Sequence, residues 1–214
     1  MSNSALVTYK RLSSHMSAPR THVIDTVTIH CLVGQWTAKQ GCDYFAGTTK
    51  DAAPNYVVGK DGSIGLSVEE VNRSHCSSNR ENDDRSITIE VASDLGPPYA
   101  ITGDAYVALV KLLVDICQRN NIPKLVWSTK KSDRVQHLNG CNMTVHRDYA
   151  NKACPGDALY NAHGKIASDV NKALANNKTA MYTVQVGTYT NKLNAEAVLY
   201  KLKMAGFDGY ITQK

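Results

Sequence analysis

Apolar and polar positions along the chain predict four strands in its first half. Residues 23–33 form a nearly continuous apolar run, which predicts a buried strand. Two short apolar runs are joined by residues 59–62, where two glycines predict a hairpin because they accept a positive φ. Residues 85–91 alternate strictly, with apolar side chains on one face (Ile87, Ile89, Val91) and polar ones on the other (Ser86, Thr88, Glu90).

In the segments between and after these strands, apolar residues recur with the period of a helix. We expect helices over residues 37–45, 104–120 and 159–175. The second of them is defined by one apolar stripe, made of Val107, Val110, Leu113, Val114 and Cys117. Strands mixed with helices in this way predict an α/β domain over residues 1–175, with a central mixed β-sheet flanked by helices.

The C-terminal segment predicts a second, smaller unit. Residues 176–180 are a polar break that we interpret as a linker. Within residues 181–214, a strand pattern, a helix over 194–206 and a second strand pattern predict a small β-α-β unit. We do not expect this unit to be stable alone, because so short a chain buries little apolar surface.

Composition is that of an ordinary soluble globular protein, with 43% hydrophobic and 20% charged residues. No stretch approaches the ~18 apolar residues of a membrane span, so we expect no membrane insertion. The net charge of +5 comes without a run of Lys or Arg, which argues against nucleic acid as a partner. The N-terminus lacks the apolar core of a secretion signal, and we expect free thiols and a cytoplasmic location.

Residues 144–156 carry the strongest chemical signal. This segment, T-V-H-R-D-Y-A-N-K-A-C-P-G, holds His146, Lys152 and Cys154, and the buried strand at 23–33 contains His30. His and Cys are common zinc ligands, and three protein ligands leave a fourth position for water, as in catalytic zinc sites. We therefore expect one zinc ion per chain. The alternative for His30 is a satisfied core histidine, and for Lys152 a surface lysine.

These residues resemble the zinc-dependent N-acetylmuramoyl-L-alanine amidases shared by phage lysozymes, bacterial wall amidases and peptidoglycan recognition proteins. Four segments carry the resemblance over residues 23–166: the strand with His30, N-Y-V-V-G-K-D-G-S-I, S-I-T-I-E-V, and H-R-D-Y-A-N-K-A-C-P-G. It implies that His30, His146 and Cys154 bind zinc. It also implies hydrolysis of the amide bond between the lactyl group of N-acetylmuramic acid and L-alanine in peptidoglycan.

The resemblance further assigns roles to residues outside the ligand set. It implies Glu90 as the general base, Tyr56 as an assisting hydroxyl and Lys152 as a stabiliser of the oxyanion. The alternatives are a salt-bridged structural carboxylate for Glu90 and a core aromatic for Tyr56. We place His75 and Asn55 in substrate binding; many relatives carry His or Ser in place of Asn55, and a plain surface histidine is the alternative for His75.

Residues 181–214 resemble half of a SPOR-type wall-binding domain, a family that binds glycan strands. A single half implies a truncated domain, a tail docked on the amidase, or two tails completing one another in a homodimer. The leading interpretation is a phage or prophage endolysin, held in the cytoplasm until its release to the wall, with glycan strand and stem peptide as its partners. A bacterial autolysin or spore-lysis amidase, and a recognition module that binds without cutting, are the alternatives.

Overall fold

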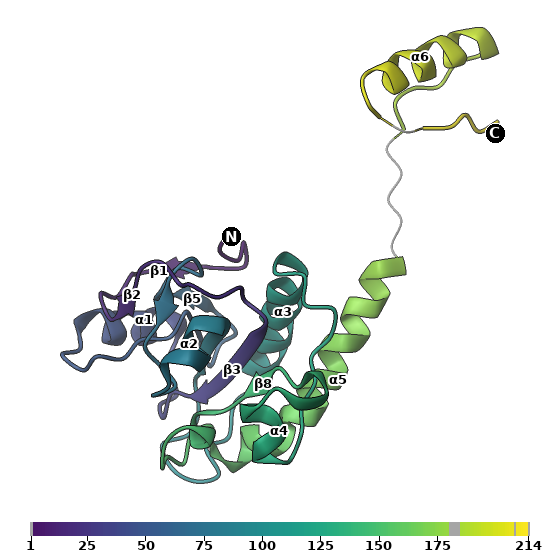
Figure 1. Cartoon of the computed structure of the whole chain (residues 1–214). Coiled ribbons are helices and arrows are strands. Elements are labelled where there is room, and N and C mark those ends of the chain that lie inside the picture. The colour runs from purple at the N-terminus through teal and green to yellow at the C-terminus, as the bar shows by residue number, and fades with distance from the viewer. Residues whose placement is uncertain (1, 180–184, 208, 214) are drawn as a thin grey trace. The chain divides into compact units, whose positions relative to one another are not determined.

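The computed structural model describes residues 2–179, 185–207 and 209–213, which divide into two compact units (Figure 1). The first unit is Met1–Asn177 and the second is Lys178–Lys214. Among the described residues, no helix combines the length and the apolar content that a membrane crossing needs.

The first unit is built on a six-stranded mixed sheet in the order β1-β5-β4-β7-β3-β8. Parallel pairing joins β7 to β3 and β4, β3 to β8, and β1 to β5, while β4 and β5 form the antiparallel hairpin expected from the sequence. A separate two-stranded ribbon pairs β2 with β6. The strands are β1 (Tyr9–Lys10), β2 (Met16–Ser17), β3 (Thr26–Cys31), β4 (Tyr56–Val58), β5 (Ile64–Leu66), β6 (Arg73–Ser74), β7 (Ser86–Val91) and β8 (Met143–Thr144).

Helices flank this sheet, which confirms the predicted α/β class (Figure 1). They are α1 (Ala38–Gly47), α2 (Arg80–Arg85), α3 (Gly103–Arg119), α4 (Lys131–Val135) and α5 (Gly156–Thr179), with 3-10 turns at Leu138–Gly140 and His146–Asp148. Helix α1 begins where the sequence predicts, because Thr37 and Gln40 form a capping box that satisfies its first backbone donors.

The two faces of the sheet carry different kinds of side chains. Ile29, Ile89 and Tyr56 pack into the main core together with α3 and α5. The next residue along each strand points to the other face, because side chains alternate. This second face carries His30, Glu90 and Val57, which are paired in register, and Val57 lies against α1 in a smaller apolar cluster. The functional side chains therefore stand on the face opposite the main core.

The stripe predicted for α3 is only partly correct. Leu113 and Cys117 are buried, but Val107 is 51% exposed. The buried face also includes alanines and leucines that the predicted stripe left out: Ala105, Ala108, Leu109 and Leu112, together with Ile116. A helical period alone does not determine which of two adjoining stripes of side chains packs against the sheet. Alanines fit the buried face because their side chains are small.

Among its described residues, the second unit holds α6 (Lys192–Met204). Residues 185–189 and 209–213 have no strand structure, and the expected strand residues 181–184 lie outside the described residues. Helix α5 continues through residues 176–179 of the predicted linker, and the boundary between the two units falls between residues 177 and 178.

Candidate active site

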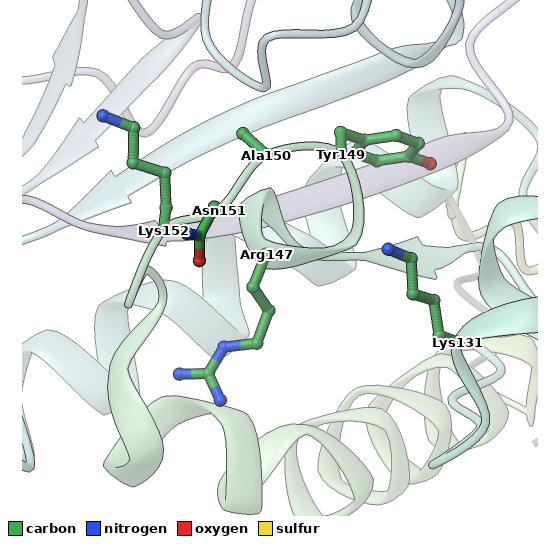
Figure 2. A pocket seen from close by; sticks show the side chains of 6 residues that line it. All are labelled: Lys131, Arg147, Tyr149, Ala150, Asn151 and Lys152. Atoms are coloured by element: carbon green, nitrogen blue, oxygen red, sulfur yellow. The ribbon is translucent and has the colours of Figure 1, made fainter.

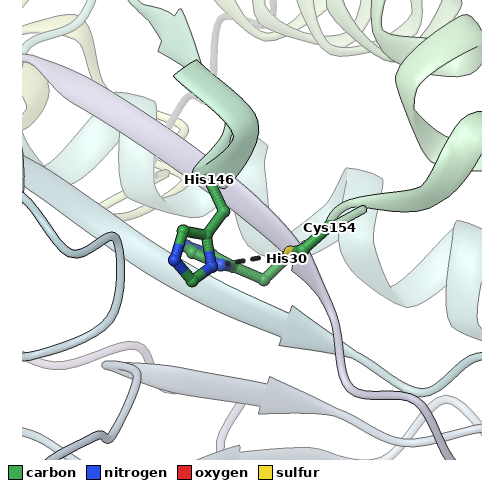
Figure 3. A group of neighbouring side chains, drawn as sticks. All are labelled: His30, His146 and Cys154. Carbon is green, nitrogen blue, oxygen red and sulfur yellow. Dashed lines mark hydrogen bonds between the residues drawn. The ribbon is translucent and has the colours of Figure 1, made fainter. Parts of the chain in front are cut away.

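Three metal-ligating side chains from distant parts of the chain converge at the edge of the second sheet face (Figure 3). His30 comes from β3, His146 begins the 3-10 turn after β8, and Cys154 lies just before α5. Their ligand atoms all lie within 4.8 Å of one another, and His30 Nδ1 is 3.4 Å from Cys154 Sγ. Two imidazoles and one thiol at these separations match the donor set of a tetrahedral metal site with one position left open.

Burial sets the protonation of these ligands. It lowers the pKa of His30 well below its ordinary value, with a further contribution from His146, and it lowers the pKa of His146 too. A hydrogen bond with the Cys31 thiol, together with burial, raises the pKa of Cys154. The cluster is therefore neutral until a metal ion displaces the thiol proton, and both imidazoles are in the form that binds metals.

Glu90 lies beside the ligands with a free carboxylate oxygen. Its Oε1 is 3.9 Å from His30 Nδ1 and 3.8 Å from Cys76 Sγ. Within the described part of the chain, its buried Oε2 has no hydrogen-bond partner, and no Lys or Arg pairs with it. Burial, followed by the nearby Cys31, raises the pKa of Glu90 well above its usual range. A carboxylate in this setting is suited to proton transfer rather than to a structural ion pair.

Lys152 is exposed and lies close enough to the ligands to affect them. Its positive charge is a cause, after burial, of the lowered pKa of His146. It also lines a pocket of about 420 Å³ together with residues of the same loop and of α4 (Figure 2). A lysine here could place positive charge near a substrate carbonyl at the metal site.

Tyr56 does not reach the site, and its predicted catalytic role was wrong. It is paired with Ile89, not with Glu90, so its ring points into the core on the other face of the sheet. Its hydroxyl donates to Glu70 Oε1 at 2.6 Å and accepts from the backbone N–H of Ser4. Tyr56 is therefore the core aromatic that was the alternative interpretation.

Asn55 is also removed from the substrate-binding set. It is fully buried, its side-chain oxygen accepts from the Thr88 N–H at 3.1 Å, and its amide donates to the Val68 carbonyl. These bonds tie the start of β4 to β7, and no part of the side chain remains for a ligand.

His75 is held away from the ligand cluster. Its two ring nitrogens contact Asp51 at 2.7 Å and Ser17 at 2.9 Å, and its side chain is 24% exposed. His75 contributes no atom to the clusters of possible metal-ligand atoms found among the described residues. Its role in substrate binding stays a prediction.

The loop before α2 supplies contacts that the sequence analysis missed. Ser78 Oγ lies 3.0 Å from His146 Nε2, so the hydroxyl can orient this imidazole and leave Nδ1 for a metal. Asp83 accepts from the backbone N–H groups of Cys76 and Ser77, which fixes the loop. No motif marks these residues in the sequence, because their importance comes from the folding of the loop over the site.

A buried ion pair anchors the segment that carries His146. Asp148 receives two hydrogen bonds from Arg134, at 2.8 and 2.6 Å, and both side chains are almost fully buried. The ligand Cys154 is fixed further along by Gly156, whose φ is +77°. A Cβ on Gly156 would lie 2.7 Å from the Cβ of Tyr99, so this position requires glycine.

Comparison with solved structures shows that other proteins share this fold. PlyL is 15% identical with a TM-score of 0.55, and the match covers 76% of this chain and 95% of that one. A mutant endolysin from Bacillus subtilis is 13% identical with a TM-score of 0.54, covering 77% and 99%. A selenomethionine derivative of AmpD is 18% identical with a TM-score of 0.54, covering 80% and 95%. A search of curated protein sequences gave no match.

Two family profiles match the sequence itself. The SPOR domain profile matches residues 162–213, which include α6. The N-acetylmuramoyl-L-alanine amidase profile matches residues 20–157, which contain all three clustered ligands and Glu90. With well over half of its 214 residues covered, the chain belongs to the N-acetylmuramoyl-L-alanine amidase family.

Proposed function

We propose that the protein is a zinc-dependent N-acetylmuramoyl-L-alanine amidase, in which His30, His146 and Cys154 hold one zinc ion. The family match supports the activity, and the donor set of two imidazoles and one thiol supports zinc as the metal. When bound, zinc supplies Lewis acidity that polarises an amide carbonyl and acidifies a water molecule.

Three side chains of the protein have the remaining roles in the reaction. Glu90 accepts a proton from the attacking water and passes it to the leaving amine of L-alanine, since its raised pKa favours both transfers. Lys152 places a positive charge near the oxygen on which negative charge develops. Ser78 keeps the His146 ring in its orientation through the 3.0 Å contact. The bond cleaved joins the lactyl group of N-acetylmuramic acid to the stem peptide.

One observation carries the proposal: two imidazoles and one thiol have their ligand atoms within 4.8 Å of one another, and Glu90 Oε1 is 3.9 Å from His30 Nδ1. The test is incubation of the purified protein with a defined muramyl peptide, with products identified by mass. We expect the intact lactyl sugar and a peptide with a free L-alanine amino group. Cleavage between two amino acids of the peptide would contradict the assignment.

Wall binding is the second function that we propose, for residues 181–214, with residues 1–175 as the catalytic domain and 176–180 as the linker. The SPOR match over residues 162–213 favours it. We expect the full chain to sediment with purified glycan strands and a chain ending at residue 179 to lose part of this binding. Sedimentation equilibrium tests whether two such tails form a homodimer.

The biological setting that we propose is lysis of a host wall by a phage or prophage endolysin, with a bacterial autolysin or spore-lysis amidase as the alternative. A holin gene next to the coding sequence would support the endolysin, and its absence beside several independent copies of the gene would count against it.

A further inference from the structure

A basic pocket adjoins the metal site. It has a volume of about 420 Å³ and is lined by Lys131, Arg147, Tyr149, Ala150, Asn151 and Lys152 (Figure 2). Five of these six residues belong to the loop 147–152, which runs directly between the ligands His146 and Cys154. Lys131, at the start of α4, comes from across the pocket, and Figure 2 shows its ammonium group extending toward this loop. One continuous segment of the chain therefore lines the pocket and carries two of the clustered side chains.

The positive charge in this pocket is largely uncompensated. Lys131 and Lys152 form no ion pair with any residue that the structure describes, and no lining residue carries a carboxylate. Arg147 is paired with Asp157 at 3.2 Å outside the lining, but its buried Nε has no partner among the described residues. Three cations with one carboxylate nearby leave an excess of positive charge, which attracts an anionic group.

The proposed substrate has such a group at the right place in its sequence. In peptidoglycan stem peptides, D-glutamate follows the L-alanine whose amide bond is cleaved, and its α-carboxyl group is free in some walls and amidated in others. The pocket begins at Lys152, two residues from Cys154 in the sequence, so we assign it to the substrate residue that follows the scissile L-alanine.

We propose that this pocket is a carboxylate-binding subsite, in which Lys131 and Arg147 receive the free α-carboxylate of the second stem-peptide residue. The inference rests on the proposed amidase function and extends it to substrate choice. It makes the protein selective for walls with a free carboxylate at this position over walls in which that carboxylate is amidated.

The test compares two muramyl tripeptides, both amidated at the C-terminus, that differ only in whether the D-glutamate α-carboxyl is free or amidated. We expect kcat/KM of the wild-type full chain to be about fivefold higher for the free acid, the size expected of a charge pair at a partly exposed site. K131Q should reduce this ratio to below about 2 and leave the rate for the amidated substrate unchanged. Lys131 is exposed and forms no hydrogen bond with the described residues, so the variant should fold normally.

K130Q is the matched control, since Lys130 is the exposed neighbour that does not line the pocket. It should keep the wild-type ratio. An unchanged ratio in K131Q, an equal loss of rate for both substrates, or a loss of selectivity in K130Q as well would overturn the subsite.

Binding of the two product peptides, measured by calorimetry, separates this inference from the proposed function. If neither substrate is cleaved but the acidic peptide still binds more tightly in a Lys131-dependent way, the subsite stands and the catalytic proposal fails. Equal binding of both peptides to wild type and K131Q would overturn the subsite even in an active amidase.

Discussion

Glu90→Gln separates proton transfer from metal binding. The substitution keeps the shape of the side chain and removes only its ability to accept a proton. Glu90 is next to His30, but its carboxylate accepts no hydrogen bond from His30, because Oε1 and Nδ1 are 3.9 Å apart. We therefore expect the variant to retain one zinc ion per chain and to lose most of its turnover.

The size of the expected loss of turnover follows from the role of Glu90 as a general base. A positioned general base contributes roughly 10²–10⁴-fold to a rate, which corresponds to about 3–5 kcal/mol of transition-state stabilisation. Stability should not fall, because the carboxylate is buried without a cationic partner in the described chain and its burial is what raises its pKa. The thermal midpoint of Glu90→Gln should equal or exceed that of the wild type at neutral pH.

Three measurements on one preparation decide this prediction: kcat from the release of L-alanine amino groups, zinc content by elemental analysis, and the thermal midpoint. Glu69→Gln is the matched control, since Glu69 is a more exposed glutamate paired with Lys10, and it should leave all three unchanged. A kcat within tenfold of the wild type would refute the role of Glu90 as the base. A loss of zinc along with activity would show that it acts as a ligand instead.

Three further predictions concern residues away from the ligands. Tyr56→Phe should leave kcat unchanged and lower the free energy of unfolding by about 1–3 kcal/mol in urea titrations, because the buried Glu70 carboxylate and the Ser4 N–H each lose one hydrogen bond. A large loss of kcat without destabilisation would restore its catalytic role. Asp148→Asn should cost about 3–5 kcal/mol by the same measurement, since it leaves Arg134 buried and uncompensated, and a cost below 1 kcal/mol would contradict this. Burial lowers the pKa of His163 to about 4, so below pH 6.5 the unfolded chain binds a proton that the folded chain does not. From pH 6.5 to 4, the free energy of unfolding of the wild type should therefore fall more steeply than that of His163→Phe, by about 1.4 kcal/mol per pH unit, and equal slopes in the two proteins would contradict this origin.

The sequence was sufficient to predict that His30, His146 and Cys154 come together, because two of them lie in one short motif. Residues 144–156 contain two of the three ligands, and His30 lies in a strand whose apolar pattern is unmistakable. The structure brings the three side chains together as expected.

Tyr56 shows where such reasoning fails. The face of the sheet on which its side chain lies depends on which residue of β7 Tyr56 is paired with. A register shift of one residue would move the side chain to the opposite face. Pairing between strands far apart in the sequence cannot be deduced from the alternation of either strand alone. Asn55 was misplaced with it, because its buried hydrogen bonds exist only once β4 and β7 are side by side.

The contacts of the loop before α2 could not be predicted for a related reason. Ser78 contacts His146 across 68 positions of sequence, and Arg134 meets Asp148 only after α4 folds over the 3-10 turn. Neither pair has a sequence spacing that predicts the contact. In the tail, by contrast, the local pattern predicted α6 correctly but could not supply the partners that its strand patterns need.

Digestion of purified peptidoglycan by the full chain, with chelator and after addition of zinc, tests the central claim most directly. New L-alanine amino termini and new reducing sugar ends are counted separately. The account predicts amino termini that disappear with chelator and return with zinc, without reducing ends. Reducing ends, or amino termini that persist at full rate after complete removal of the metal, would contradict it.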